Sequence, residues 1–401
     1  MDKPVVLTAF GGESPEHEVS VLTAMQAMAA LENSEFKLLP LYISKKGAWF
    51  TGDYLMELKH YQDLDEVEKN GIPCTFSRND IGQTVLLELK QSLFSKPKQT
   101  PVYAVLTAFH GSGGENGAFQ GICEFFNIPY TGSGVLGSAI GMDKVTAKAV
   151  CRSEEIPVVE DVNFFENEWV AEKEKIIAEI ARFAYPAVVK PVHLGSSIGV
   201  TVAANRDELT EAVELAFRYD EHVLVEKAIQ PLTEINCSVL GTPDDNKVSV
   251  CEQPLGRAEL LSFEDKYLSD DEAGKGMASA DRIIPADISE ELKDQIQQTA
   301  KDVFRTFRAS GLVRLDFLVN SDTNEFFFNE INTIPGSFSF YLWEKSGIDF
   351  SALMIEMIDI AVERNKKRNG RIQSYETNLL SRKAVKGIKG LKGTKTRNES
   401  S

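Results

Sequence analysis

Two apolar segments in the first part of the chain each run into a glycine-rich loop. Residues 4–7 lead to a glycine pair, and residues 102–108 precede a second such loop at residues 110–117. Between them, residues 18–31 have the apolar spacing of a helix, and residues 37–43 have the composition of a strand. Strands that alternate with helices predict a parallel α/β domain, whose loops at the carboxyl ends of the strands are the usual place for ligands.

Further along the chain the predicted elements are mostly strands, followed by a long helix, a hairpin and a last helix that ends near Arg364. The strands are expected at residues 184–190, 199–203 and 223–227, the helix at 289–310 and the hairpin at 312–331. We therefore expect an N-terminal α/β domain, a small central α+β unit, a C-terminal unit and a basic tail. Their predicted ranges are 1–133, 134–226, 227–363 and 364–401.

Charge is distributed unevenly along the 401 residues. The formal net charge is −17, yet the stretch from Arg364 onward contains twelve Lys or Arg and only two Glu. Because the rest of the chain is strongly acidic, nucleic acid is not expected as the main partner. The basic end, with its repeated Lys-Gly steps, is predicted to be a disordered tail, and contact with RNA or a membrane surface is the alternative.

The cysteines and the apolar runs bear on the cellular compartment. The five cysteines are odd in number and lack a paired C-x-x-C spacing, which favours reduced thiols over disulfides or a zinc site. The N-terminus lacks a basic stretch followed by an apolar core, and no apolar run reaches the roughly 18 residues of a membrane span. We therefore expect a cytoplasmic protein with no membrane partner.

The predicted hairpin at 312–331 gathers polar side chains on one face. Side chains two apart on a strand share a face, so Arg314 and Asp316 project together. Glu330 and Asn332 do the same on the returning strand, and the turn places Asp316 roughly opposite Glu330. Oxygen ligands of this kind suit magnesium, completed by phosphate oxygens and water. An exposed strand with one salt bridge would show the same pattern.

Lys190 ends a predicted strand just before the glycine-serine loop at residues 195–199. Such a loop between two strands can bring backbone N–H groups close to phosphate oxygens, and Lys190 would add a positive charge at its edge. The loop does not match the P-loop pattern G-x-x-x-x-G-K-[ST]. Phosphate binding and an ordinary turn are both compatible with the sequence here.

The strand predicted at residues 223–227 ends in two charged residues. Glu226 and Lys227 are suited to hydrogen-bond the edge of an adenine, and Glu234 to accept from ribose hydroxyls. Two exposed charges at a strand end are the alternative.

Two loops of the first domain carry the remaining candidates, Glu16 and His110. Both loops follow predicted strands of a parallel sheet, where ligands usually bind. The alternatives are that Glu16 simply favours the N-terminus of the helix that follows it, and that His110 is a hydrogen-bonded loop histidine without a ligand.

Taken in order, the motifs resemble the D-alanine–D-alanine ligase family of the ATP-grasp superfamily. They read G-G-x-S-x-E-H-E-V-S, H-G-x-x-G-E-N-G-x-x-Q-G, M-D-K, V-K-P-x-x-x-G-S-S-x-G-V, E-K, D-K-Y, R-x-D and N-E-I-N-T-x-P-G. The match covers residues 4–362. It implies an ATP-grasp fold of class α/β and α+β, with ATP bound between the central and C-terminal subdomains.

The resemblance also implies a role for each matching residue. The catalytic residues would be Glu16, Ser196, Arg314 and Tyr267. ATP would be bound by Lys144, Lys190, Ser197, Glu226, Lys227, Ile229, Glu234 and Lys266. Glu16, His110 and Gly336 would bind substrate, with Glu16 and His110 at the first D-alanine. Two Mg²⁺ ions, with Mn²⁺ as a possible substitute, would be held by Asp316, Glu330 and Asn332.

The activity implied is the joining of two D-alanines for peptidoglycan precursors, and a homodimer is the assembly to consider. ATP would turn the carboxylate of the first D-alanine into an acyl phosphate, which the amine of the second attacks. Arg314 would stabilise the tetrahedral oxyanion, and a loop at about residues 266–284 would exclude water from the acyl phosphate.

Two positions depart from the family pattern. Asn116 stands where the family usually has Asp, with little expected effect. After Gly336 the chain is shorter than in the family and lacks a serine that contacts the second substrate. We hypothesise a first site strict for D-alanine and an altered second site. In it Ser337 or Ser339 would replace the missing contact, while three aromatic residues would narrow the pocket, namely Phe338, Phe340 and Tyr341.

Two other functions are compatible with the sequence. One is a related ligase that uses D-serine, D-lactate or another acceptor. The other is a nucleotide-binding regulator without turnover, although a pure binder has little need for the full set of metal and phosphate residues.

Overall fold

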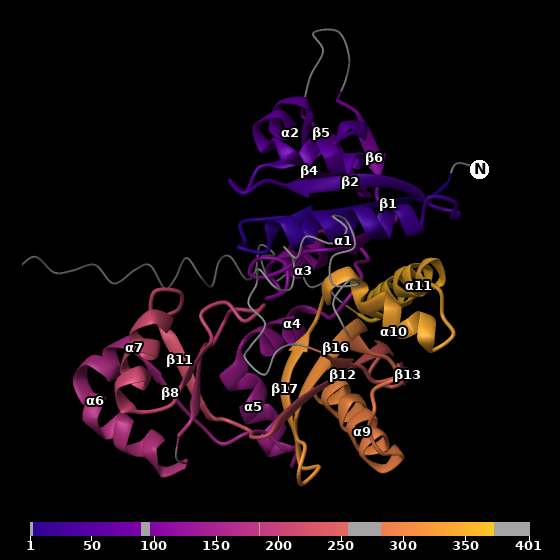
Figure 1. The fold of residues 1–401 in the computed structure, drawn as a ribbon. Coiled ribbons are helices and arrows are strands. Elements are labelled where there is room, and N and C mark those ends of the chain that lie inside the picture. The colour runs from indigo at the N-terminus through magenta and orange to yellow at the C-terminus, as the bar shows by residue number, and fades with distance from the viewer. Residues whose placement is uncertain (1–2, 90–96, 184, 256–281, 373–401) are drawn as a thin grey trace, which may run out of the picture.

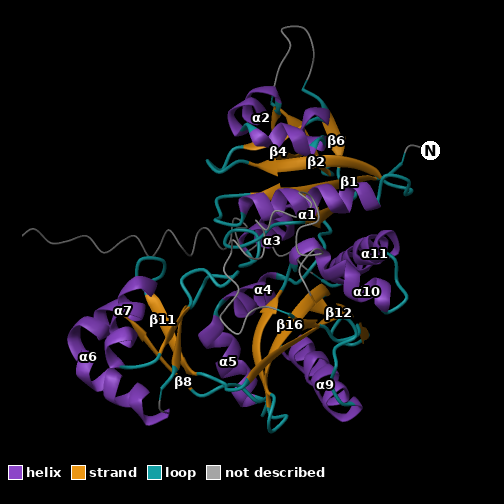
Figure 2. Ribbon diagram, viewed as in Figure 1, coloured by secondary structure: helices purple, strands orange, loops and turns teal. Residues whose placement is uncertain are grey.

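The computed structural model describes residues 3–89, 97–183, 185–255 and 282–372. Figure 1 shows an N-terminal domain at the top of the view, a central unit at the lower left and a C-terminal unit at the lower right. The secondary structure is mixed throughout (Figure 2), as the predicted α/β and α+β class requires. None of the described helices is long and apolar enough to cross a membrane.

The N-terminal domain is built on a sheet with the strand order β6-β5-β4-β3-β2-β1-β7. Its strands are β1 (Val5–Gly11), β2 (Lys37–Ile43), β3 (Trp49–Thr51), β4 (Ile72–Arg78), β5 (Thr84–Glu88), β6 (Gln99–Pro101) and β7 (Ala104–Thr107). Its helices are α1 (His17–Ala30), η1 (Asp53–Met56), η2 (Leu58–Gln62), α2 (Leu64–Asn70) and α3 (Ala118–Phe126).

The expectation of a parallel first sheet is only partly correct. Strand β1 pairs in parallel with β2 and β7, but every pair from β2 outward to β6 is antiparallel. A tight turn explains the first reversal, because Ser44 N donates to Ala48 O over 2.8 Å between β2 and β3. Such a turn is far too short for the crossover that parallel neighbours need. Strands β1 and β7, which pair in parallel, are the ones that lead into the two candidate loops.

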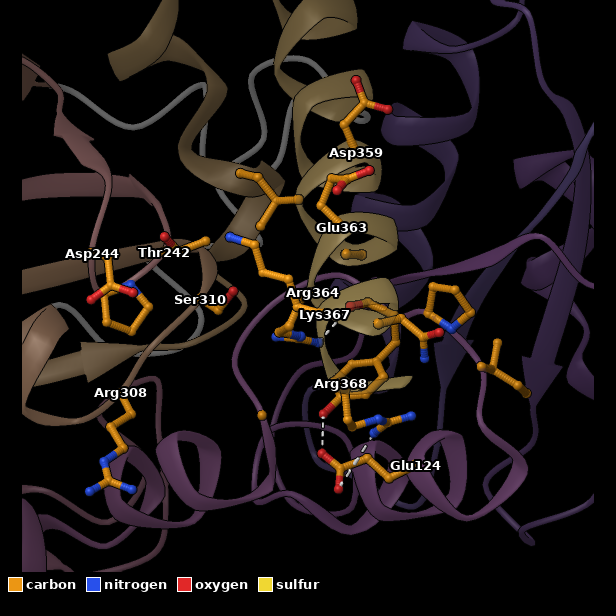
Figure 3. A pocket seen from close by; sticks show the side chains of 18 of the residues that line it. Glu124, Thr242, Asp244, Arg308, Ser310, Asp359, Glu363, Arg364, Lys367 and Arg368 are labelled. Atoms are coloured by element: carbon orange, nitrogen blue, oxygen red, sulfur yellow. Dashed lines mark hydrogen bonds and ion pairs between the residues drawn. The ribbon is translucent and has the colours of Figure 1, made fainter. Parts of the chain in front are cut away.

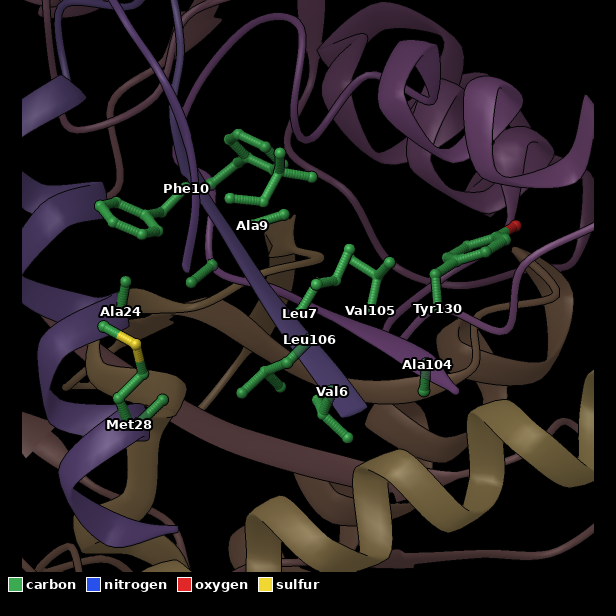
Figure 4. Close-up of a cluster of buried hydrophobic side chains, with 14 of the residues drawn as sticks. Val6, Leu7, Ala9, Phe10, Ala24, Met28, Ala104, Val105, Leu106 and Tyr130 are labelled. Carbon is green, nitrogen blue, oxygen red and sulfur yellow. The ribbon is translucent and has the colours of Figure 1, made fainter. Parts of the chain in front are cut away.

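The main hydrophobic core joins the first domain to the end of the chain. Val6, Leu7 and Phe10 of β1 are fully buried, with side chains on both faces of the sheet (Figure 4). The same cluster includes Leu353 and Met357 from the last helix. Because residues far apart in sequence share this core, the N-terminal loops are held against the C-terminal unit.

The central unit is a four-stranded antiparallel sheet with the order β10-β9-β11-β8. Its strands are β8 (Asp161–Phe165), β9 (Ala187–Pro191), β10 (Thr201–Ala203) and β11 (His222–Lys227). Helices α6 (Glu166–Ile180) and α7 (Arg206–Ala216) and the short η3 (Ala181–Phe183) pack on this sheet, while α4 (Val135–Met142) and α5 (Lys144–Ser153) precede it in the chain.

The C-terminal unit contains a second antiparallel sheet, β13-β12-β16-β17, and a two-stranded ribbon, β14-β15. The strands are β12 (Leu232–Gly241), β13 (Asn246–Val248), β14 (Gln253–Pro254), β15 (Arg282–Ile283), β16 (Gly311–Asn320) and β17 (Phe326–Asn332). The helices are α9 (Glu290–Thr306), η5 (Gly336–Ser339), α10 (Phe340–Lys345) and α11 (Phe350–Asn369). The two antiparallel sheets flank helix α5, which begins at Lys144 (Figure 2).

The last helix runs beyond Arg364 to Asn369, so the predicted start of the basic tail at Arg364 is wrong. Arg364 Nη1 donates to Gly132 O over 2.6 Å, and Nη2 donates to Tyr130 O over 2.8 Å. Its guanidinium also lies 4.4 Å from the centre of the Tyr130 ring. Figure 3 shows Arg364 on α11, with Lys367 and Arg368 on the same helix. Arg364 therefore ties α11 to the segment that leaves the first domain.

We expect a chain that ends at Arg371 to keep the thermal midpoint and turnover of the full protein. A chain that ends at Glu363 should melt several degrees lower, because it loses hydrogen bonds from a charged donor that are worth roughly 1.5–3 kcal/mol each. Differential scanning calorimetry of both chains measures this, and Arg364→Met in the full chain should reproduce most of the loss. Equal midpoints for the two truncated chains would contradict the assignment.

Candidate active site

The β16–β17 hairpin confirms the expected register of its polar residues. Asp316 lies opposite Glu330, and Arg314 lies opposite Asn332. Arg314 makes a two-pronged ion pair with Asp316, with Nε 2.6 Å from Oδ1 and Nη2 2.7 Å from Oδ2. Asn332 Nδ2 donates to Asp316 Oδ2 over 3.1 Å. This face of the hairpin is a compact, mostly buried polar group with two carboxylates, an amide and a guanidinium.

A β-bulge in this hairpin adds a residue that the sequence analysis missed. The register shifts between Asp316 and Phe317, which leaves Asn329 without a partner across the ladder. In a regular strand Asn329 would share the buried face of Ile331. Instead its side-chain oxygen accepts a hydrogen bond from Lys190 Nζ over 2.9 Å. The bulge thus links the acidic hairpin to the central sheet.

On the central sheet, Glu226 lies between two lysines. Lys190 Nζ is 2.5 Å from Glu226 Oε2, and Lys148 Nζ donates to Glu226 Oε1. Burial opposes ionisation of Glu226, but the two lysines outweigh it and lower its pKa to about 2. Lys227 is exposed, and the other two residues expected near the nucleotide, Ile229 and Glu234, are half-buried.

The sequence analysis assigned no role to Lys148, although its spacing from Lys144 could have indicated one. It lies four residues after Lys144 on α5, so the two side chains share one face of that helix. Lys144 Nζ donates to Leu194 O, just before the glycine-serine loop, and lies 3.9 Å from Glu330 Oε2. Burial lowers the pKa of Lys144. Helix α5 therefore directs Lys144 to the hairpin and Lys148 to the central sheet.

The glycine-serine loop reaches the first domain through Ser196, whose hydroxyl donates to Glu16 Oε1. Ser196 and Ser197 have φ of 51° and 58°, a left-handed conformation that is strained for serine. Gly111 lies on the other side, and a Cβ atom there would come within 3.0 Å of Glu16 Oε2. Loops from the first and central units therefore meet closely around the Glu16 carboxylate.

Glu115 also joins two parts of the site, although the sequence analysis gave this motif residue no role. Its Oε2 accepts from Gly111 N over 2.7 Å, and its Oε1 accepts from Ile334 N over 3.2 Å. Burial, with Glu16 nearby, raises the pKa of Glu115 to about 8. A cavity of about 30 Å³ lies beside it, with Lys144 and Glu330 in its wall.

His110 is buried, and its Nε2 is hydrogen-bonded to Thr23 Oγ1 over 2.9 Å. Burial and the neighbouring Arg314 lower its pKa from 6.5 to about 3, so the ring is neutral. Thr23 Oγ1 also accepts from Ser337 N over 3.3 Å. His110 is therefore a fixed, uncharged group beside the segment that follows Gly336.

The pKa of His110 is lower in the folded protein than in the unfolded chain. As the pH falls, the imidazole is therefore protonated in the unfolded chain before it is protonated in the folded protein. The contribution of the neutral ring to stability is present above pH 6.5 and is lost as the pH falls towards about 3. Urea unfolding between pH 4 and pH 8 should therefore show a smaller acid loss of stability for His110→Gln than for the unchanged protein. Parallel profiles for His110→Gln and the unmodified protein would contradict this expected result.

Two aromatic residues of the segment after Gly336 do not line a pocket as we hypothesised. Ser337, Phe338 and Ser339 have φ of 51°, 52° and 44°, so the chain makes a tight left-handed turn. Phe338 is fully buried in the main core, and Phe340 stacks on Phe350 with ring centres 4.6 Å apart. The expectation that Phe338 and Phe340 narrow a substrate pocket is therefore wrong, because Phe338 is buried in the core and Phe340, half-buried, packs on Phe350 at its edge.

Tyr341 lies in a buried polar group close to Arg314. Its hydroxyl donates to Glu252 Oε1 over 3.3 Å, and the guanidinium of Arg282 lies 4.0 Å from the centre of its ring. Arg282 Nη1 also donates to Glu252 Oε2 over 2.7 Å. Tyr341 is therefore held in place by Glu252 and Arg282 on the interior side of the site.

Two expected site residues, Lys266 and Tyr267, lie outside the described residues, as does most of the predicted covering loop. Within the described ranges, no three or more His, Cys, Asp or Glu side chains are arranged to hold a metal. The five cysteines, all in described positions, are buried free thiols.

Two antiparallel sheets, with lysines on one and an acidic hairpin on the other, define the ATP-grasp class. Solved structures agree. The chain matches the D-alanine-D-alanine ligase from Coxiella burnetii with a TM-score of 0.77 and 28% identity, covering 97% of this chain and 100% of that one. It matches a D-Ala:D-Ser ligase from Enterococcus faecalis with a TM-score of 0.75 and 29% identity, over 90% and 99% of the two chains.

The sequence comparisons narrow the class to one family. The family models "D-ala D-ala ligase N-terminus" and "D-ala D-ala ligase C-terminus" match residues 5–133 and 150–359. The D-alanine--D-alanine ligase of Thermosipho melanesiensis is 41% identical, covering 94% of this chain and 98% of its own. That of Bacillus velezensis is 34% identical over 90% and 98%. The chain belongs to the D-alanine–D-alanine ligase family.

Proposed function

We propose that the protein uses ATP to join two D-alanines, through an acyl phosphate, for peptidoglycan precursor synthesis. The observation that carries this proposal is the convergence on one site of Arg314, Asp316 and Glu330 with Lys144 and Lys190. Phosphoryl transfer needs acidic metal ligands and cations placed together, because catalysis there is mainly positioning and electrostatic stabilisation. The family membership of the chain supports the same function and a cytoplasmic location.

We propose that Asp316, Glu330 and Asn332 hold Mg²⁺, two ions in the full site, with Mn²⁺ as a substitute. These residues offer hard oxygen ligands side by side across the hairpin, the kind of ligand that Mg²⁺ prefers. When bound, the metal would supply positive charge against the phosphate oxygens. Asp316 already has Arg314 and Asn332 as partners, which fixes the direction of its carboxylate.

Different residues of the chain would bind the phosphates, the adenine and the ribose of ATP. Lys144 and Lys190 offset phosphate charge, with the backbone of the glycine-serine loop at Ser197 closing over it. The pocket for adenine and ribose is assigned to Glu226, Lys227, Ile229 and Glu234. Lys266, outside the described residues, is proposed to reach the transferred phosphate.

The first D-alanine is assigned to the junction of the first and central units. Glu16 would hold its ammonium group, supported by Ser196 and by Tyr267, and the neutral His110 would lie near its carboxylate. Arg314 and the backbone at Gly336 would bind the oxygen that becomes negative when the second amine attacks. Because the acyl phosphate reacts with water, closure of the loops around this junction would also protect it.

Release of phosphate from ATP is expected to require both magnesium and D-alanine. The test is a phosphate-release assay of the purified protein with ATP, with and without Mg²⁺, against a panel of D-amino and D-hydroxy acids, with dipeptide measured alongside. Equal release with and without an amino acid would contradict the ligase function and favour a nucleotide-binding regulator or a plain ATPase.

The proposal also concerns the identity of the second substrate, the acceptor. A structural neighbour named as a D-Ala:D-Ser ligase matches about as well as one named as a D-alanine ligase, so overall fold does not separate the acceptors. The segment after Gly336 makes a left-handed turn, and we propose that this shortened segment influences which acceptor the second site takes. If the second site uses D-alanine readily and rejects D-serine and D-lactate, its acceptor preference is not altered and the protein makes only the D-alanine dipeptide. The assembly to test by sedimentation is a homodimer.

A further inference from the structure

Helix α5 presents three basic side chains along one face, at intervals of four residues. They are Lys144, Lys148 and Arg152. Lys148 is the most deeply buried of them, with a side chain that is only 1% exposed. A lysine is almost never buried to this extent unless it is paired, so its partners show what it does.

The partners of Lys148 are two carboxylates that face each other across neighbouring strands. Glu226 of β11 lies opposite Asp161 of β8, and both side chains are less than 5% exposed. Lys148 donates to Glu226 Oε1 and lies 3.3 Å from Asp161 Oδ1. Arg152 pairs with Asp161 from the next turn of the helix. Two cations of α5 therefore balance two buried anions of the central sheet.

Lys190 is the third cation of this group. Its ammonium contacts Glu226 Oε2 at 2.5 Å, and Asn329 accepts from it on the other side. If Lys190 turned towards a phosphate without another cation nearby, Glu226 would be left as an unpaired buried charge, which is strongly unfavourable. Lys148 removes that obstacle because it occupies the other carboxylate oxygen.

We infer that Lys148 is the permanent counter-ion of Glu226, which leaves Lys190 free to exchange its contact with Glu226 for a nucleotide phosphate. This inference rests on the proposed function, because Lys190 must meet a phosphate. Lys148 is a positioning residue in this arrangement, since it acts through Glu226 and Lys190. Glu226 stays ionised throughout and keeps an oxygen that can accept from an adenine amino group.

The test is calorimetric titration of the purified full chain with Mg·ADP. Lys148→Met should weaken binding by at least about tenfold, because Lys190 is then the sole close cation for Glu226. Lys148→Arg should restore most of the affinity. In a Glu226→Gln background, Lys148→Met should change the affinity by less than about twofold, because position 226 then carries no charge to hold Lys190 and Arg152 still balances Asp161.

The matched control is Lys175→Met, which neutralises an exposed lysine of α6 and should leave nucleotide affinity unchanged. Thermal melting of each variant separates a loss of fold from a loss of affinity, and the double variant provides a folded comparison if Lys148→Met alone does not fold. Unchanged affinity for Lys148→Met, or an equal loss with and without Glu226, overturns the inference alone. If the protein without any substitution binds no Mg·ADP, the proposed function is overturned as well.

Discussion

Glu330→Gln is expected to lower turnover by at least about a hundredfold while the protein stays folded. The change keeps the size and shape of the side chain but removes the charge that faces Asp316 across the hairpin. Lys144, 3.9 Å from Glu330, would also lose an anionic neighbour, so phosphate positioning should suffer together with metal binding. Steady-state release of phosphate and dipeptide at saturating ATP and D-alanine measures the effect.

The control for this variant lies in the same hairpin. Glu325 is exposed in the turn before β17, so Glu325→Gln removes an equal charge at a distance from the polar face and should keep normal turnover. Raising the Mg²⁺ concentration should partly rescue Glu330→Gln and leave the control unaffected. Turnover of the Glu330 variant equal to that of the unchanged protein would refute the metal assignment.

Arg314→Lys is expected to lower dipeptide formation by about 10²–10³-fold, the range found when one donor to a developing oxyanion is lost. Arg314 uses two nitrogens for Asp316, and a lysine cannot reproduce this forked geometry. The loss should appear in kcat more than in KM for ATP, because Lys144 and Lys190, which meet the phosphates in our proposal, are unchanged. Phosphate release should fall less than dipeptide formation, since an acyl phosphate that waits for the amine is open to hydrolysis.

Arg305→Lys supplies the comparison, because Arg305 makes an exposed ion pair with Asp302 on α9. Exposed pairs contribute little, so turnover and melting should stay close to those of the unchanged protein. If Arg314→Lys and Arg305→Lys were equally active, Arg314 would be a structural partner of Asp316 and not an oxyanion ligand.

The sequence by itself determined the elements that depend on local periodicity. Strand β2 was predicted with its exact bounds, and Asp316 was correctly placed opposite Glu330, because side chains alternate along a strand and a short turn sets the register. The ordered motifs were also sufficient to identify the family, which the comparisons confirm. These features require no knowledge of how distant segments pack.

Tertiary structure alone decided which distant residues share a buried space. The bulge that turns Asn329 towards Lys190 and the burial of Phe338 have no local signature. Helix spacing puts Lys148 on the face of Lys144, but only the packing of α5 against the central sheet shows that it meets Glu226. A buried charge must find a partner and a buried ring must fill a space, and both depend on groups brought together only when the chain folds.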